Sequence, residues 1–210
     1  MKNIIDITIP LGPDTPLYPG DPQPELELLN CISEGDALTA SKLHLASHVG
    51  THVDLPAHFV ENGATLGDYT VDRFVGPGWV LDLSDVSKSI CVDRLAKEKI
   101  PEQRHLILRT RNSRLLQESN FVDDYVYLEE DAASWLLETN PLSIGIDYYS
   151  LDPVDSVAFK AHRRCAEVGI PVFVCLDLRK LGAGACWFAG LPVSFPALEG
   201  APVRAIVWYD

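Results

Sequence analysis

The chain has 210 residues, of which 47% are hydrophobic and 22% are charged, and its formal net charge is -13. This length suits one well-buried domain covering residues 1–210, and two domains would be cramped. Nucleic acids and anionic membrane surfaces attract basic proteins, so the acidic charge disfavours both as partners. No stretch of the sequence approaches the ~20 apolar residues of a membrane span.

The five cysteines are scattered and form no Cys-x-x-Cys motif. An odd number of scattered cysteines indicates free thiols in a reducing compartment. The N-terminal residues reach Asp6 before any apolar run long enough for a signal peptide. We therefore expect a cytoplasmic protein.

Short apolar runs rich in β-branched residues, bounded by Gly, Pro, Asn or Asp, predict eight strands. They cover residues 4–9, 25–30, 42–46, 79–83, 106–110, 143–146, 171–176 and 203–209. Helices are predicted over residues 92–99, 131–139 and 156–168, the last capped by Ser156 and closed by Gly169. Many strands and few helices predict an α/β fold with a mixed sheet, whose strand order the sequence does not reveal.

The loop over residues 10–24 is rich in proline, glycine and aspartate. Its core, residues 16–21, is rigid and partly apolar, as expected for the wall of a pocket. A turn-rich connection is the alternative, and composition alone favours it.

The most informative segment is His48-Val-Gly-Thr-His-Val-Asp-Leu-Pro-Ala-His58, which holds three of the six histidines. Imidazole nitrogens and carboxylate oxygens are preferred ligands of zinc and manganese. A helix would place only His48 and His52 on one face, and Pro56 would break it. The glutamate of a zincin helix is also absent, because Val49 stands in its place.

In an extended chain these residues would all point to one side. At about 3.3 Å per residue, however, His48 and His58 would lie roughly 30 Å apart. The chain must therefore turn, and Gly50 and Pro56 are placed to turn it. A strand end followed by a tight loop would bring His48, His52 and Asp54 to one metal.

Three protein ligands leave one position open for water, as in catalytic metal sites. A closed structural zinc site is disfavoured because it usually draws on cysteines, and none lies near this segment. Taken singly, a histidine is usually a surface or core residue, and that is our interpretation of His44 and His105.

The sequence resembles the cyclase family of metal-dependent hydrolases, which includes bacterial kynurenine formamidases (arylformamidases). The segment 48–58 carries the resemblance most specifically. Weaker pieces follow in the order of the family: Tyr18-Pro-Gly-Asp21, Gly145-Ile-Asp147, Ala161-His162, Gly169-Ile-Pro171 and Ala201-Pro-Val-Arg-Ala205. The resemblance implies a swivelling β/β/α fold, a homodimer or homotetramer, and one or two divalent metal ions, zinc or manganese, per chain.

Position by position, the resemblance implies that His48, His52 and Asp54 bind the first metal and that Asp54 bridges to a second ion. His162 corresponds to a ligand of that second ion, and His58 corresponds to the catalytic acid/base. The implied reaction is the hydrolysis of a small aromatic amide, N-formylkynurenine, to kynurenine and formate in tryptophan catabolism.

Two positions depart from the family pattern. Tyr18 stands where the formamidases usually have a tryptophan that lines the substrate pocket, so an aromatic wall is kept. Val174 stands where they have a metal-binding glutamate, and valine binds no metal. Glu167 lies about 140° round the helix from His162 and is a poor substitute. Cys175, the next residue on a strand, should face away.

The loss of that glutamate leaves a single-metal site as an alternative to a two-metal one. It also leaves two alternative functions: hydrolysis of another cyclic or linear amide, such as an isatin-like lactam, and binding of a small molecule without catalysis.

Overall fold

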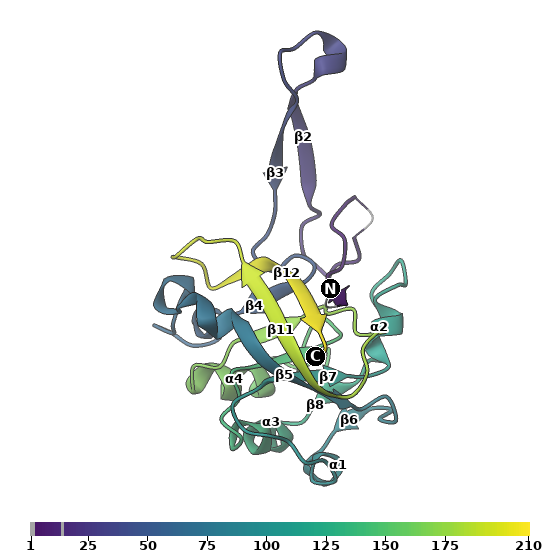
Figure 1. The fold of residues 1–210 in the computed structure, drawn as a ribbon, viewed down its shortest axis with the longest axis vertical. Helices are drawn as coiled ribbons and strands as arrows, with labels where there is room; N and C mark the ends of the chain where they lie inside the picture. The colour runs from purple at the N-terminus through teal and green to yellow at the C-terminus, as the bar shows by residue number, and fades with distance from the viewer. Residues whose placement is uncertain (1–2, 14) are drawn as a thin grey trace.

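An eight-stranded mixed sheet forms the centre of the computed structural model, which describes residues 3–13 and 15–210 (Figure 1). Asp14, in the loop 10–24, lies outside the described residues. The strands are β1 (Ile4–Asp6), β4 (His52–Asp54), β5 (Val75–Asp82), β7 (His105–Arg109), β9 (Ser143–Ile146), β10 (Val172–Val174), β11 (Gly184–Pro192) and β12 (Gly200–Trp208). Their order in the sheet is β1-β12-β11-β5-β7-β9-β10-β4.

The sheet closes on itself, because β4 pairs with both β10 and β12. Strands β5, β7, β9 and β10 run parallel to one another. The pairings of β11 with β5, and of β12 with β11, β1 and β4, are antiparallel. The structure thus confirms the expected mixed α/β fold with few helices.

The helices are short: α1 (Val92–Leu95), α2 (Asn112–Leu115), α3 (Glu130–Leu137) and α4 (Lys160–Glu167). A minor two-stranded sheet joins β6 (Ser89–Ile90) and β8 (Tyr127–Leu128). Helices α3 and α4 cover one face of the sheet, where Ala133 and Ala161 pack with Leu106 and Ile144. The other face encloses a second core that includes Phe173. In the described part of the chain no helix is long and apolar enough to cross a bilayer.

Strands β2 (Glu25–Asn30) and β3 (Ala40–His44) form a separate antiparallel hairpin that projects from the body of the molecule (Figure 1). A 3-10 turn, Ile32–Glu34, lies near its end. We call residues 25–44 the arm.

Most predicted elements are found, and four strands, β4, β6, β8 and β11, are not anticipated by the sequence patterns. Strands 25–30 and 143–146 have the predicted bounds. Strand β4 has only three residues, too few to show a period. Strand β11 begins at Gly184 and includes Gly190, which breaks the alternation. Gly190 is required there because a Cβ atom would lie 2.7 Å from the Phe173 ring.

The predicted start of the last helix is wrong. Helix α4 begins at Lys160, and the Ser156 hydroxyl instead accepts a hydrogen bond from the Phe159 amide in the preceding turn. The carboxylate of Asp152 accepts hydrogen bonds from the amides of Ala161 and His162. It therefore caps the helix from ten residues before His162. The C-terminal end agrees with the prediction, since Gly169 follows with a φ of 74°.

We expect one core histidine to give the protein an acid-sensitive stability. His105 is fully buried on β7, and burial together with the Arg73 cation lowers its pKa to about 4. In the unfolded chain the pKa is about 6.5, so only the unfolded state binds this proton as the pH falls from 6.5 to 4. The free energy of unfolding should therefore fall across this window, by about 3 kcal/mol from His105.

Urea unfolding at pH 7, 6, 5 and 4 measures this slope, and His105→Gln should flatten it. His44→Gln is the matched control, because His44 is exposed on the arm and should leave the slope unchanged. Equal slopes for wild type and His105→Gln would contradict the assignment.

Candidate metal centre

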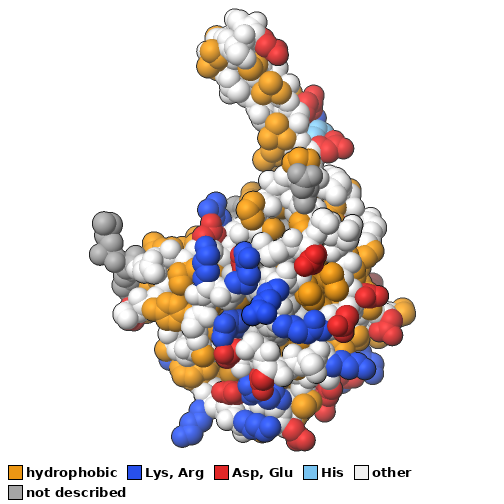
Figure 2. All heavy atoms as spheres, turned by 90° about the vertical axis from the view of Figure 1, so that its right-hand side faces the viewer, with side chains coloured by type: hydrophobic (Ala, Val, Ile, Leu, Met, Phe, Trp, Pro, Cys, Tyr) orange, Lys and Arg blue, Asp and Glu red, His pale blue; other side chains and the backbone are white. Residues whose placement is uncertain are grey.

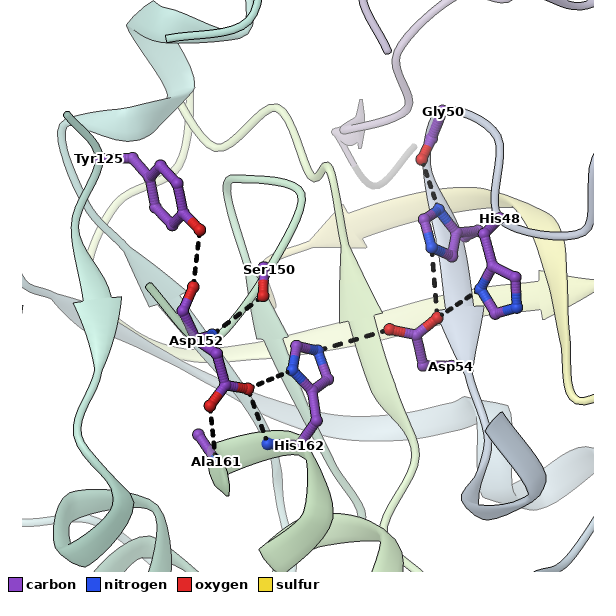
Figure 3. A network of polar contacts seen from close by, with 9 residues as sticks. His48, Gly50, Asp54, Tyr125, Ser150, Asp152, Ala161 and His162 are labelled. Atoms are coloured by element: carbon purple, nitrogen blue, oxygen red, sulfur yellow. Dashed lines mark hydrogen bonds and ion pairs between the residues drawn. The ribbon is translucent and has the colours of Figure 1, made fainter. Parts of the chain in front are cut away.

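The carboxylate of Asp54 lies at the centre of a group of imidazoles (Figure 3). Asp54 and His52 are both buried, and alternation along β4 places them on one face. Asp54 Oδ1 lies 2.7 Å from His48 Nδ1 and 3.2 Å from His52 Nε2. Its Oδ2 lies 3.5 Å from Nε2 of His162, on α4. The fold thus brings four of the predicted metal-site residues together.

Gly50 turns the chain between His48 and β4, with a φ of 60°. A Cβ atom at Gly50 would also lie 2.4 Å from the side chain of Leu11. On β12, a Cβ at Gly200 would lie 2.5 Å from the His48 ring, so glycine admits that ring. Strand β3 ends at His44 before this turn, so the predicted strand end followed by a tight loop is present, whereas the strand β4 that carries His52 and Asp54 was not predicted.

In both His52 and His48, the ring nitrogen that points away from Asp54 contacts another polar group. His52 Nδ1 lies 2.8 Å from the carbonyl oxygen of Gly50, an acceptor that fixes the proton on Nδ1 and leaves Nε2 to face Asp54. His48 Nε2 lies 3.2 Å from the carboxylate of Glu199. The Ser47 hydroxyl donates to the same Glu199 oxygen at 2.6 Å. Such outer contacts orient the ligand nitrogens of metal sites.

His162 is oriented in the same way, by the carboxylate of Asp152. Its Nδ1 lies 2.7 Å from Asp152 Oδ2, while its Nε2 is buried and has no hydrogen-bond partner. The unpartnered Nε2 faces Asp54 (Figure 3). A buried polar atom without a partner is costly unless something else binds it. This geometry fits an ion between His162 and Asp54.

The charges are strongly coupled. Burial alone would raise the pKa of Asp54, but the imidazoles of His52, His162 and His48 hold it well below its usual value. Burial opposes protonation of His162, yet the nearby carboxylates of Asp152 and Asp54 raise its pKa to about 9. The centre therefore carries a carboxylate that is ionised at all working pH values.

The distances between the Asp54 oxygens and the imidazole nitrogens that face them match those of a metal site. Two ligands on a tetrahedral zinc ion, at bonds of about 2.1 Å, lie about 3.4 Å apart. The distances from Asp54 to His52 and His162 are 3.2 and 3.5 Å. A nitrogen and oxygen donor set without sulfur suits zinc or manganese. The residues present therefore fit a divalent ion.

His58 lies against this group at the end of a 3-10 turn, Pro56–His58, so the chain turns at Pro56 as predicted. Its ring stacks on His48 with centroids 3.9 Å apart. One ligand atom from each of His48, Asp54 and His58 falls within 4.8 Å of the others. Burial, together with the nearby imidazoles, lowers the pKa of His58, so its neutral form is favoured.

Val174 shares the face of the metal centre. It pairs directly with His52 across the antiparallel β10–β4 ladder, and directly paired residues project to the same side of a sheet. It is fully buried and packs against Ala161 in the helix-side core. Cys175 has a φ of 55° and packs in a different cluster with Tyr148, so its side chain turns away as expected.

A pocket of about 450 Å³ opens beside the centre. Four aromatic side chains line it: Tyr18, Phe59, Tyr149 and Phe159. Asp21 also lines the pocket, so the loop 10–24 contributes to its wall. This volume and lining suit a small aromatic molecule.

The predicted Tyr18 lies in the pocket wall, with its ring 5.3 Å from that of Phe121 and 6.5 Å from that of Tyr149. Phe159, which sequence reasoning missed, has a left-handed backbone with a φ of 45°. This conformation is rare for a bulky residue and costs of order 1–3 kcal/mol, and such strain gathers at functional sites. No sequence pattern marks it.

Comparisons with known proteins show which family the chain is similar to. The family model described as "Putative cyclase" matches residues 5–153. The kynurenine formamidases of Bacillus thuringiensis subsp. konkukian and Bacillus anthracis are each 32% identical over 203 residues, covering 97% of this chain and 96% of theirs.

Solved structures are similar over nearly the whole chain. A predicted metal-dependent hydrolase from Bacillus stearothermophilus has a TM-score of 0.86 and 26% identity, covering 99% of this chain and 98% of its own. Isatin hydrolase A from Ralstonia solanacearum has a TM-score of 0.85 and 21% identity, covering 99% and 92%, and so shares the fold.

The fold and the histidine–aspartate centre define a metal-dependent hydrolase that acts on an amide. The chain belongs to the cyclase family.

We expect Asp152 to strengthen metal binding through His162. Asp152→Asn removes the negative charge behind Nδ1, so the basicity and orientation of Nε2 should suffer and metal affinity should fall about 10- to 100-fold. Competition with a chromophoric zinc chelator measures the affinity. Asp155→Asn is the control, because Asp155 is exposed in the same segment. An unchanged affinity for Asp152→Asn, or an equal loss for the control, would argue against this role.

Proposed function

We propose that the protein is an arylformamidase that hydrolyses N-formylkynurenine to kynurenine and formate. The observation that carries this proposal is the convergence of three histidines on Asp54, each with its outer nitrogen held, beside an aromatic pocket. The 32% identity to kynurenine formamidases over 97% of the chain supports the same substrate.

His48, His52 and Asp54 would hold the divalent ion, zinc or manganese, and His162 would face it from the far side of Asp54. When bound, such an ion supplies a water of lowered pKa and polarises a carbonyl group. Asp54 offsets the charge of the ion. The carbonyls, carboxylates and helix that hold the imidazoles keep the nitrogens in place without further reorganisation.

His58 is the proposed proton carrier. Its side chain reaches the pocket and its lowered pKa favours the neutral imidazole, which accepts a proton. It would take the proton from the attacking water and return it to the leaving nitrogen of the amide. Tyr18 and the other aromatic side chains of the pocket would hold the substrate ring.

We propose one tightly held ion per chain. Val174 supplies no ligand on the face that His52 and Asp54 share, although the bridging position of Asp54 would allow a second, weaker ion.

We further propose that residues 1–210 act as one catalytic domain in the cytoplasm, as a homodimer or homotetramer. The five free cysteines support a reducing compartment.

Arg163 is the proposed carboxylate-binding residue. It is the one lysine or arginine among the described residues that line the pocket. Its Nε donates to the carbonyl oxygen of Ala158 at 2.9 Å, and no described carboxylate forms an ion pair with it, so its terminal nitrogens are available. N-formylkynurenine is an amino acid, and a guanidinium suits its carboxylate.

A second candidate is the opening of an isatin-like lactam or hydrolysis of another amide. Val174 favours it, since we expect that reaction to need a single ion. Isatin carries no amino-acid carboxylate, so it makes no use of Arg163 before its ring opens. Comparing turnover of the two substrates distinguishes the candidates.

The first test measures metal per chain by plasma mass spectrometry and formate release from N-formylkynurenine on one sample. Wild type should contain about one zinc or manganese ion and release formate. His52→Ala should lose both, since it removes a ligand. His58→Ala should keep the metal while kcat falls about 10²- to 10⁴-fold.

Loss of all metal from His58→Ala would make His58 a ligand instead. Bound metal with turnover of isatin but not of N-formylkynurenine would favour the second candidate. Wild-type protein that neither binds added zinc or manganese nor releases formate would overturn the hydrolase proposal.

Removal of the guanidinium should affect only substrates that carry the amino-acid group. Arg163→Met should raise KM for N-formylkynurenine about 10- to 100-fold, the order expected for a lost charge-assisted pair. KM for formanilide, which has no carboxylate, should not change. Arg164→Met is the matched control, because Arg164 pairs with Glu130 and Glu167 instead. Equal effects of Arg163→Met on both substrates would contradict carboxylate recognition.

A further inference from the structure

Residues 153–159 form a loop that connects Asp152 to helix α4 beside the pocket. The two ends of this loop are held together, because the Asp152 carboxylate accepts a hydrogen bond from the Ala161 amide at 2.8 Å. The same carboxylate lies 2.7 Å from His162 Nδ1, so the base of the loop is fixed at the metal centre. Compact surface loops whose ends lie close together are frequently functional.

The loop exposes an apolar side chain at the rim of the pocket. Val157 lines the pocket, yet 93% of its surface is exposed. A single exposed valine elsewhere on the surface would be ordinary. At this rim, however, a shift of the loop toward the pocket would bury Val157 against a bound aromatic ring, and burial of apolar surface would favour that position.

The backbone at the end of the loop has an uncommon conformation. Phe159 has a φ of 45° and a ψ of 53°, and its ring lies 5.8 Å from that of Phe59 in the pocket. A left-handed backbone is disfavoured for a bulky residue, so other conformations of Phe159 are lower in energy. A change in its dihedral angles would swing residues 153–158 relative to α4, as expected of a hinge at the end of an element.

The hydrogen bonds of the loop are local. The Ser156 amide donates to the Pro153 carbonyl at 2.9 Å, and the Phe159 amide donates to the Ser156 hydroxyl at 3.0 Å. The Ala158 carbonyl accepts from Arg163 Nε at 2.9 Å, and Arg163 itself lines the pocket. A substrate that binds the guanidinium of Arg163 is therefore connected to the loop through one hydrogen bond.

We propose that residues 153–159 are a lid that closes over the bound substrate, and that Val157 contacts the substrate ring in the closed form. This role rests on the proposed function, because the lid requires an aromatic substrate to close on. Closure would exclude water from the metal centre and thereby strengthen the electrostatic interactions there. It would also make Val157 a residue that selects substrates with a ring.

Steady-state kinetics test the contact with Val157. Val157→Ser should raise KM about 10-fold for the aromatic amide that the enzyme hydrolyses, N-formylkynurenine or isatin, because one valine side chain no longer contributes its burial. The metal content should not change. Val157→Ile keeps an apolar side chain and should keep the wild-type KM. Val154→Ser is the matched control, because Val154 is exposed in the same loop and lies outside the pocket lining.

Hydrogen exchange on wild type tests closure without a variant and without turnover. Kynurenine and isatin are the ligands, and the amides of residues 154–159 should exchange more slowly when either one is bound. The arm, which projects from the body of the molecule (Figure 2), provides reference amides whose exchange should not change.

An unchanged KM for Val157→Ser, or an equal rise for Val154→Ser, would overturn the role of Val157. Exchange of the loop amides that neither ligand slows would overturn the lid. Slower exchange in a protein that releases no formate from N-formylkynurenine would support the lid and contradict only the formamidase proposal.

Discussion

The negative charge of Asp54 is the constraint on which the centre of this protein depends. A carboxylate so deeply buried is expensive unless positive charge surrounds it. Here His48, His52 and His162 do so from three directions, and a divalent ion would do so more completely. The carboxylates of Asp152 and Asp54 raise the pKa of His162 to about 9, so this imidazole supplies part of the positive charge that Asp54 requires. The same arrangement therefore gives both a stable core and a strong cation site.

The closed sheet is what makes this arrangement possible. Strand β4 bridges β10 and β12, so both of its edges are paired and His52 and Asp54 cannot shift in register. Gly200 on β12 leaves room for the His48 ring, and α4 packs on the neighbouring core to present His162. Contacts between residues that are far apart in the sequence thus position each metal-binding side chain. A flexible peptide with the same motif would have to order all these groups on binding the ion.

The sequence revealed the donor types and the need for a turn at Gly50, because ligand chemistry and backbone preferences are local properties. It could not reveal Glu199 or Asp152, whose roles exist only once the sheet closes and α4 docks. Strand β4 escaped prediction because three residues show no period, and the start of α4 was misplaced because Asp152 caps it from a distance. The strained backbone of Phe159 likewise depends on tertiary packing. Local signals therefore identified the chemistry, and long-range contacts decided its geometry.

Val174 lies on the ligand face of the sheet but contributes to packing rather than to metal binding. Its pairing with His52 places it on the ligand face, yet its side chain packs with Ala161 in the helix-side core and strengthens that core. A carboxylate there would need a cation close by to offset its burial. With valine, α4 packs on the sheet without that requirement, and Asp152 still orients the His162 ring. The orientation of the imidazoles therefore comes from Asp152, Glu199 and the Gly50 carbonyl and does not depend on a ligand at position 174.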